Sequence, residues 1–254
     1  MAKLTVELVP CLRDNYAYIV SDAGQGVWAV VDPSEPDPVI RALGERKLTH
    51  ILNTHHHPDH TGGNLALKAR YGAPVVGPAK DAERIPGIDV GVSEDKPWML
   101  GGHEARILEI PAHTKAHVAF YFADDGVVFT GDTLFAMGCG RLFEGTPDMM
   151  WASLSKLMSL PDSTRVYCGH EYTLNNGRFA LTVEPNNAEL KARMRYVESQ
   201  RAQVKPTIPT VMGLEKRTNP FLRPNSPDIR RTLNMEKASD VEVFAEVRKR
   251  KDAF

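Results

Sequence analysis

The chain is poor in cysteine, in net charge and in long apolar runs, and each shortage excludes a class of protein. Its 254 residues include three scattered cysteines, too few for a disulfide framework or a cysteine zinc site. No apolar run approaches the roughly 18 residues of a membrane-spanning helix. The net charge of -1 provides no overall field that would attract nucleic acid or an anionic membrane. We therefore expect a small-molecule substrate, with no nucleic-acid partner and no membrane partner.

The lack of a long apolar run and the low number of cysteines also predict the cellular compartment. Residues 1–10 alternate like a strand and lack the apolar core of a signal peptide. Cys11, Cys139 and Cys168 are then most simply reduced thiols of a cytoplasmic protein. A hydrophobic content of 42% and a charged content of 25% are ordinary for a globular protein, and we expect a monomer.

The first two thirds of the chain mixes short strands with short helices. Alternating or buried apolar runs predict strands at 3–9, 16–21, 27–32, 49–54, 105–110 and 165–173. A hairpin is predicted over 117–132, with Asp124, Asp125 and Gly126 at its turn. Apolar residues at helical spacing predict helices at 37–46, 62–72 and 148–160.

The sequence changes character after about residue 171, where strand signals disappear. Helical spacing recurs at 187–204 and 240–254. The Pro- and Asn-rich segment 205–228 between them predicts a long irregular connection. We therefore predict an α/β domain over residues 1–170 and a small, mainly helical domain over residues 171–254.

Four of the nine histidines lie between Asn53 and Gly63, in the stretch NTHHHPDHTGG. This stretch follows a predicted buried strand, and histidines at such density rarely serve packing. In extended chain, His55, His57 and Asp59 would project to one side, because they are spaced by two. His60 would project to the other side, at the start of the next helix. Imidazole and carboxylate groups arranged in this way suit zinc, iron or manganese.

Three further candidates each follow a predicted strand: His113 in EIPAHT, Asp132 in VVFTGDT and His170 in VYCGHE. Strand ends are where α/β folds place their sites. A carboxylate has two oxygens, so Asp132 can bind two ions at once. The predicted ligands are His55, His57 and His113 on one ion, Asp59, His60 and His170 on the other, and Asp132 shared.

Each of these residues also has an ordinary structural interpretation. The histidine tract could be a polar loop, and His113 or His117 alone is more often a hydrogen-bonded structural residue. Asp132 in a TGDT turn is, by itself, more often a turn or N-cap residue. Only the joint pattern favours a binuclear metal site. The remaining histidines are interpreted as spacer, surface or structural residues: His50, His56 and His103.

The motifs THHHPDH, PAHT, GDTLF and CGHEYT together resemble the metallo-β-lactamase superfamily with its T-H-x-H-x-D-H signature. The segments VPCLRDNYAYIV, GDTLFAMGCGRLFEGT, YCGHEYTLNN, NPFLR and RKRKDAF are similar to the glyoxalase II (hydroxyacylglutathione hydrolase) family, over nearly the whole chain. The resemblance implies an α+β fold. This fold is an αββα four-layer sandwich of two packed sheets with helices outside, followed by a small helical domain.

The resemblance also implies a cofactor and a reaction. The family holds two divalent metal ions per chain, with zinc expected here and iron or manganese as alternatives, at the seven positions given above. It hydrolyses S-D-lactoylglutathione and related 2-hydroxyacyl-glutathiones to the hydroxy acid and glutathione, the second step of methylglyoxal degradation. The nucleophile is a metal-bridging hydroxide, which Asp59 is expected to orient.

The family's substrate-binding positions carry over with one notable departure. Arg141 and Phe143 stand where the family often has Lys and Tyr, and Phe143 lacks the hydroxyl that could donate to glutathione. Tyr172 matches the tyrosine after the last ligand. Arg248 and Lys251 match the basic residues that hold the glycine carboxylate of glutathione.

Other functions would use parts of the same pattern. A phosphodiesterase of this superfamily would need a basic surface to bind nucleic acid, and the net charge of -1 argues against one. A lactonase or β-lactamase reaction would not explain the C-terminal cations Arg248 and Lys251. An oxygen-reducing diiron enzyme would usually have a glutamate at the position of His57. A metal-storing protein leaves Arg141 and Tyr172 unexplained. Thioester hydrolysis is therefore the preferred prediction.

Overall fold

The computed structural model describes residues 2–254 and divides into two compact units. The first unit contains the chain up to Glu109 together with Ala116–Gly131, and the second contains Ile110–Lys115 together with Asp132–Phe254. This division falls near residue 131, whereas the change in sequence character falls near 170. The domain boundary at residue 170 therefore stays a prediction.

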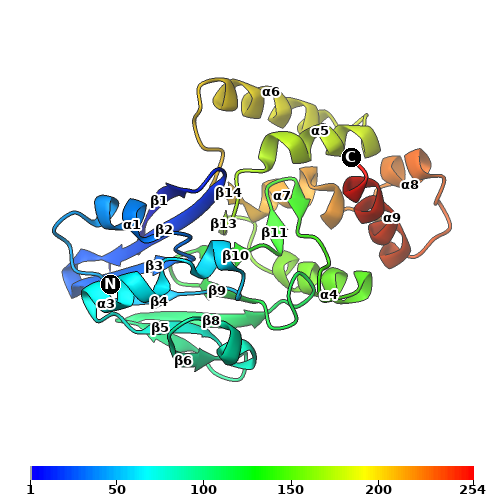
Figure 1. Ribbon diagram of the computed structural model, residues 1–254. Helices are drawn as coiled ribbons and strands as arrows, with labels where there is room; N and C mark the ends of the chain where they lie inside the picture. The colour runs from blue at the N-terminus through cyan, green and yellow to red at the C-terminus, as the bar shows by residue number, and fades with distance from the viewer. Residues whose placement is uncertain (1) are drawn as a thin grey trace. The chain divides into compact units, whose positions relative to one another are not determined.

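The first unit is built on a six-stranded mixed sheet (Figure 1). Its strands in spatial order are β1 (Thr5–Cys11), β2 (Asn15–Asp22), β3 (Val27–Val31), β4 (His50–Leu52), β5 (Val75–Pro78) and β6 (Ile88–Val92). The first three strands are antiparallel, and β3 to β6 are parallel. Parallel neighbours need crossovers, which the helices between them provide.

Helices α1 (Pro36–Leu43) and α3 (Asn64–Tyr71) cover one face of this sheet (Figure 1). Helix α1 begins with proline in its first turn, where the missing N–H costs nothing. Helix α3 ends at Gly72, which adopts a left-handed conformation with a φ of 68°. One apolar cluster joins both helices to the sheet through Val39, Leu43, Leu67, Ile19, Val30 and Ile51.

A second, antiparallel sheet lies in the same unit. Its strands are β7 (Trp98–Leu100), β8 (His103–Glu109), β9 (Val118–Phe122) and β10 (Val127–Gly131). The rings of Tyr18 on β2 and Phe129 on β10 lie 5.6 Å apart between centroids. Those of His50 on β4 and Trp98 on β7 lie 5.5 Å apart. The two sheets therefore pack face to face, as the predicted sandwich requires.

The second unit is mainly helical. Its helices are α4 (Pro147–Met158), α5 (Thr173–Val183), α6 (Ala188–Ala202), α7 (Met212–Thr218), α8 (Pro227–Leu233) and α9 (Asp240–Asp252). Its short strands are β11 (Leu134–Phe135), β12 (Gly138–Cys139), β13 (Arg165–Cys168) and β14 (Thr210–Val211). Four further short helices occur in the chain: η1 (Ala23–Gln25), α2 (Pro58–Thr61), η2 (Ala79–Arg84) and η3 (Pro220–Leu222). Among residues 2–254, no helix is both long and apolar enough to cross a membrane.

The prediction of an irregular connection over 205–228 is wrong. The segment contains β14, α7 and η3, so strands also occur after residue 171. Helix α7 forms around the buried carboxylate of Glu215, which accepts hydrogen bonds from Arg193, from Thr210 and from the backbone N–H of Met137. Arg193 and Met137 are distant in the chain, so local helical spacing gives no sign of them. A short helix held by tertiary contacts is beyond period-based prediction.

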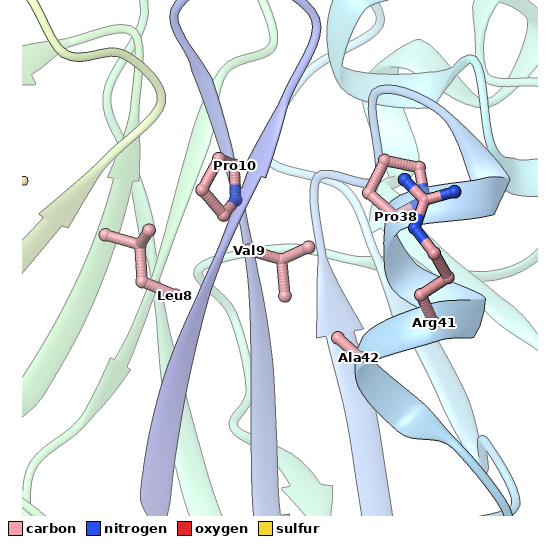
Figure 2. A pocket seen from close by; sticks show the side chains of 6 residues that line it. All are labelled: Leu8, Val9, Pro10, Pro38, Arg41 and Ala42. Carbon is pink, nitrogen blue, oxygen red and sulfur yellow. The ribbon is translucent and has the colours of Figure 1, made fainter. Parts of the chain in front are cut away.

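A cavity of about 430 Å³ opens between β1 and α1. Its lining residues are Leu8, Val9, Pro10, Pro38, Arg41 and Ala42 (Figure 2). This lining is apolar apart from Arg41, and it contains no histidine or carboxylate. This cavity therefore offers no metal ligand or general base, and the candidate catalytic residues lie in other parts of the structure.

His103 joins four segments of the first unit at a buried site. Its Nδ1 lies 3.0 Å from a carboxylate oxygen of Asp125, and its Nε2 lies 3.1 Å from one of Asp22. Asp125 also accepts a hydrogen bond from the backbone N–H of Leu4, at 2.7 Å. Burial lowers the pKa of His103, but the hydrogen bonds to Asp22 and Asp125 outweigh burial and raise that pKa above its usual value.

We expect His103→Gln to remove a pH-dependent part of the stability. Because the folded pKa is raised, the stabilisation is present below the unfolded pKa of about 6.5 and is lost as pH rises through the folded pKa. Urea unfolding across this range should give slopes for the parent and the variant that differ by up to about one proton. His50→Gln is the control, because burial lowers the pKa of His50 and its contribution has the opposite sign. Identical pH slopes for the parent and His103→Gln would contradict the assignment.

Candidate metal centre

The carboxylate of Asp32 anchors the histidine-rich loop. Asp32 follows β3 with a φ of 49°, which is rare for a residue other than glycine. One of its oxygens accepts a hydrogen bond from the N–H of Thr54 at 2.8 Å. The other accepts from the Thr54 hydroxyl at 2.7 Å and lies 3.1 Å from Nδ1 of His60. This single buried carboxylate therefore holds both ends of the loop.

The same contacts determine which ring nitrogen of His55 can act as a ligand. The Thr54 hydroxyl gives its proton to Asp32, so it accepts from Nδ1 of His55, 3.0 Å away. The lone pair of His55 is then on Nε2, which lies 3.1 Å from Nδ1 of His57. Two nitrogens that bind one tetrahedral zinc at about 2.0 Å lie roughly 3.3 Å apart. The ring of His117 stacks on that of His55, with centroids 4.6 Å apart, and supports its orientation.

Asp59 and His60 belong to a helix. The expectation of extended chain from His55 to Asp59 is wrong, because α2 begins at Pro58, a residue suited to the first helical turn. Nδ1 of His60 faces the acceptor Asp32, so its lone pair is on Nε2, 3.6 Å from an oxygen of Asp59. That Asp59 oxygen and the Asp59 carbonyl both accept hydrogen bonds from the side-chain amide of Asn15, each at 3.0 Å.

In the second unit, His113 and His170 face the same oxygen of Asp132. Nε2 of His170 lies 3.2 Å from it and Nε2 of His113 lies 3.5 Å from it. Nδ1 of His113 donates to the carbonyl of Arg141 at 3.0 Å, which leaves the lone pair on Nε2. Gly140 passes so close that an added Cβ would lie 1.9 Å from the carbonyl oxygen of Asp132. The Gly-Cys-Gly turn therefore requires glycine at this position.

Aromatic rings lie against two of these histidines. Tyr172 stacks on His170, with centroids 4.6 Å apart and planes 5° apart. Phe143 packs on His113, with centroids 5.2 Å apart, and 62% of Phe143 is exposed. An exposed ring beside a candidate metal ligand can contact a substrate through its apolar face.

The three predicted cations lie in quite different surroundings. Arg248, in the last turns of α9, is buried, whereas Arg141 is largely exposed. The Lys251 ammonium lies over the rings of Phe179 and Phe254, at 5.5 Å and 5.0 Å from their centroids. The pKa of Lys251 is lowered to about 8, chiefly by burial and also by the nearby charges of Arg248 and Arg141.

The cysteines are buried thiols. Burial raises the pKa of Cys139 to about 11 and that of Cys168 to about 12. Burial also raises the pKa of Cys11. A nucleophilic cysteine needs a lowered pKa, so none of these thiols suits covalent catalysis.

Several residues of these clusters were not predicted from the sequence. Asp32, Asn15 and Asp81 act on the histidine loop from distant segments, and Asp81 binds Nδ1 of His56 at 2.9 Å. His56 is therefore anchored rather than a simple spacer. The spacing of His55 to His60 carries no information on these partners, since each lies at least 20 residues away. His103 is structural, as interpreted, and buried rather than on the surface.

These clusters fit a divalent metal pair. Each unit gathers imidazoles and carboxylates, the ligand types that zinc, iron and manganese accept. In three of the histidines a hydrogen bond at Nδ1 leaves the lone pair on Nε2, the arrangement usual for metal-binding histidine.

Comparisons with known proteins cover the whole chain. Residues 12–170 match the family model "Metallo-beta-lactamase superfamily", and residues 171–254 match "Hydroxyacylglutathione hydrolase C-terminus". The hydroxyacylglutathione hydrolase of Methylococcus capsulatus is 52% identical over 253 residues, 99% of each chain.

Solved structures show the same fold. ETHE1 from Myxococcus xanthus has a TM-score of 0.69 and 24% identity, covering 96% of this chain and 90% of its own. TTHA1623, solved in a di-iron-bound form, has a TM-score of 0.61 and 27% identity, covering 84% of this chain and 98% of its own.

We expect Asn15→Ala to weaken the binding of one metal ion and to spare the other. The side-chain amide of Asn15 holds the candidate ligand Asp59, and loss of a residue that orients a metal ligand typically costs about 10–100-fold in metal affinity. Competition with a chromogenic chelator measures this loss. Asn176→Ala is the matched control, since Asn176 is equally buried, at 5%, and its amide donates to the carbonyl of Ala136. Equal metal affinity in the parent and Asn15→Ala would refute the role of Asn15.

Proposed function

Because the chain belongs to the hydroxyacylglutathione hydrolase (glyoxalase II) family of the metallo-β-lactamase superfamily, we propose that it hydrolyses S-D-lactoylglutathione to D-lactate and glutathione. The single observation that carries this proposal is the match over residues 171–254. The metallo-β-lactamase fold hosts many reactions, whereas this C-terminal family model is named for one. The resemblance and the fold class predicted from the sequence are both confirmed.

We propose that seven residues hold two divalent ions. One ion would be bound by His55, His57 and His113, the other by Asp59, His60 and His170, with Asp132 shared. The tautomers set by Thr54, Asp32 and the Arg141 carbonyl support this assignment. Zinc is the proposed metal, and iron or manganese would suit the same ligands. When bound, such ions lower the pKa of water towards neutrality and polarise a carbonyl oxygen.

The protein's own groups would bind and orient the reactants. The carboxylate of Asp59, held by Asn15, would accept a hydrogen bond from the attacking water and fix its direction. The leaving group is a thiolate, whose conjugate acid has a pKa near 8.5, so no side chain needs to protonate it. This explains why catalysis needs neither a Ser-His-Asp triad nor a reactive cysteine.

Cations and aromatic rings would hold the glutathione part. Glutathione carries two carboxylates, and guanidinium and ammonium groups bind carboxylates well. Arg248 and Lys251 would bind the carboxylate of its glycine, with Arg141 beside them. Phe143 and Tyr172 would contact the substrate near the metals, Phe143 through its ring alone, because it lacks a hydroxyl.

The decisive experiment mixes the purified, metal-analysed protein with S-D-lactoylglutathione and follows the loss of thioester absorbance. Turnover that a chelator abolishes, with about two ions per chain, is the expected result. Bis-p-nitrophenyl phosphate and a lactone serve as rival substrates. Failure on the thioester, with two ions bound and turnover of either rival, would overturn the proposal.

Asp132→Ala should cost both ions, because the shared carboxylate faces a histidine of each proposed set. Metal analysis after gel filtration measures the number of ions per chain. Asp162→Ala, which removes an exposed carboxylate of the same unit, should keep the parent stoichiometry. Retention of two ions by Asp132→Ala would exclude a shared ligand.

Neutralising Arg248 and Lys251 together, as Arg248→Gln with Lys251→Gln, should raise KM at least about tenfold and change kcat little. These groups would bind the substrate far from its reacting carbonyl, so the loss falls on binding. Lys249→Gln with Arg250→Gln removes the same charge from the same helix and should leave KM unchanged. An unchanged KM in the first double variant would remove both residues from the site.

A further inference from the structure

Arg248 is held in place by contacts with Cys139 and Phe221, neither of which is acidic. Its Nη1 donates to the carbonyl of Cys139 at 2.9 Å. Its guanidinium lies 5.0 Å from the centroid of the Phe221 ring, within the range of a cation–π interaction. Only 5% of the residue is exposed. The direction of this side chain is therefore set by the core of the second unit.

A carboxylate already lies on this guanidinium. Oδ1 of Asp252 accepts hydrogen bonds from Nε of Arg248 at 3.1 Å and from Nη2 at 2.8 Å. The same oxygen lies 4.0 Å from Nε of Arg141. One carboxylate oxygen thus contacts both arginines, in the way that the carboxylate of a ligand would.

The position of Asp252 is unfavourable for the helix that carries it. It is the last residue of α9, where the negative end of the helix dipole disfavours a second negative charge. Its side chain is 46% exposed, so it can turn into solvent without disturbing the core. Neither the helix dipole nor packing accounts for an aspartate here, whereas its ion pairs with Arg248, one helical turn earlier, and with Arg141 do.

We propose that Asp252 competes with the substrate carboxylate for Arg248 and Arg141, and so sets the affinity of this subsite. The inference rests on the proposed function, in which these cations hold glutathione. An arriving carboxylate must displace Asp252 from the Nε and Nη2 edge of Arg248. Binding of substrate is therefore an exchange of one carboxylate for another, and its affinity is lower than the bare cations would give.

The amine of Lys251 gives the proposal a second testable consequence, a dependence on pH. Lys251 faces Arg248 and Asp252 on its own helix and Arg141 on the chain before α4, with Phe179 and Phe254 against it. The charge of Asp252 raises the pKa of Lys251, opposing the larger effects of burial and of the two arginines. Loss of that charge should therefore cause the amine to lose its proton at a lower pH. The gain in affinity should then fade as pH rises towards 8.

The test compares Asp252→Asn with the parent holoenzyme, using S-D-lactoylglutathione as substrate. We expect KM near pH 7 to fall about two- to fivefold with kcat unchanged, since a partly exposed charge pair contributes an effect of that size. Asp240→Asn is the matched control. Asp240 lies on the same helix, pairs with Arg230 at 2.7 Å and has a side chain that is 42% exposed. This control should leave KM unchanged.

A substrate without the glycine carboxylate makes the test specific. With the glycine amide of S-D-lactoylglutathione, Asp252→Asn should give no gain over the parent. A raised KM with the ordinary substrate would show that Asp252 positions Arg248, and an unchanged KM would show that no exchange occurs; either overturns the proposal. Absence of turnover by the parent would be a failure of the proposed function instead. Calorimetric titration of the parent and of Asp252→Asn with glutathione would then test the competition, because the proposal predicts a lower Kd for the variant.

Discussion

The buried carboxylate of Asp32 is the constraint on which the candidate site depends. It ends β3 in a strained backbone conformation and binds Thr54 through both the backbone N–H and the hydroxyl. Through that hydroxyl it fixes the tautomer of His55, and through direct contact it fixes that of His60. One buried acid thus sets the tautomers of two candidate metal ligands. Its partners satisfy both of its oxygens, which is what makes burial of a carboxylate tolerable.

The two units contribute in different ways. The first unit supplies a dense local cluster, in which a loop and one helical turn carry four candidate ligands. The second supplies two histidines from separate segments that converge on Asp132, under a turn in which only glycine fits at position 140. Hydrogen bonds from Asp32 and Asn15 position the first set, and close backbone packing at Gly140 positions the second. Both arrangements would hold the candidate ligands in place before a metal binds.

Sequence patterns predicted what is local and missed what is tertiary. The strands β1 to β4, the hairpin of β9 and β10 and the helix α9 follow from periodicity, and the candidate ligands from their spacing and family resemblance. Helix α7 was missed because Glu215 forms it through contacts with distant residues. Asn15 and Asp32 were missed for the same reason, and so was the approach of Asp252 to Arg141. Each is an ordinary polar residue in the sequence, and only its folded partner reveals its role.

The burial of the three cysteine thiols affects how the protein reacts with thiols and disulfides around it. Hydrolysis of a glutathione thioester would release a thiol at the site, beside a chain with three cysteines of its own. Mixed disulfides form through thiolates, and Cys139 and Cys168, with pKa values of about 11 and about 12, yield almost none at neutral pH. Buried as they are, these sulfurs are also inaccessible to a disulfide of glutathione. The fold thereby keeps the catalyst inert towards the redox chemistry of its own product.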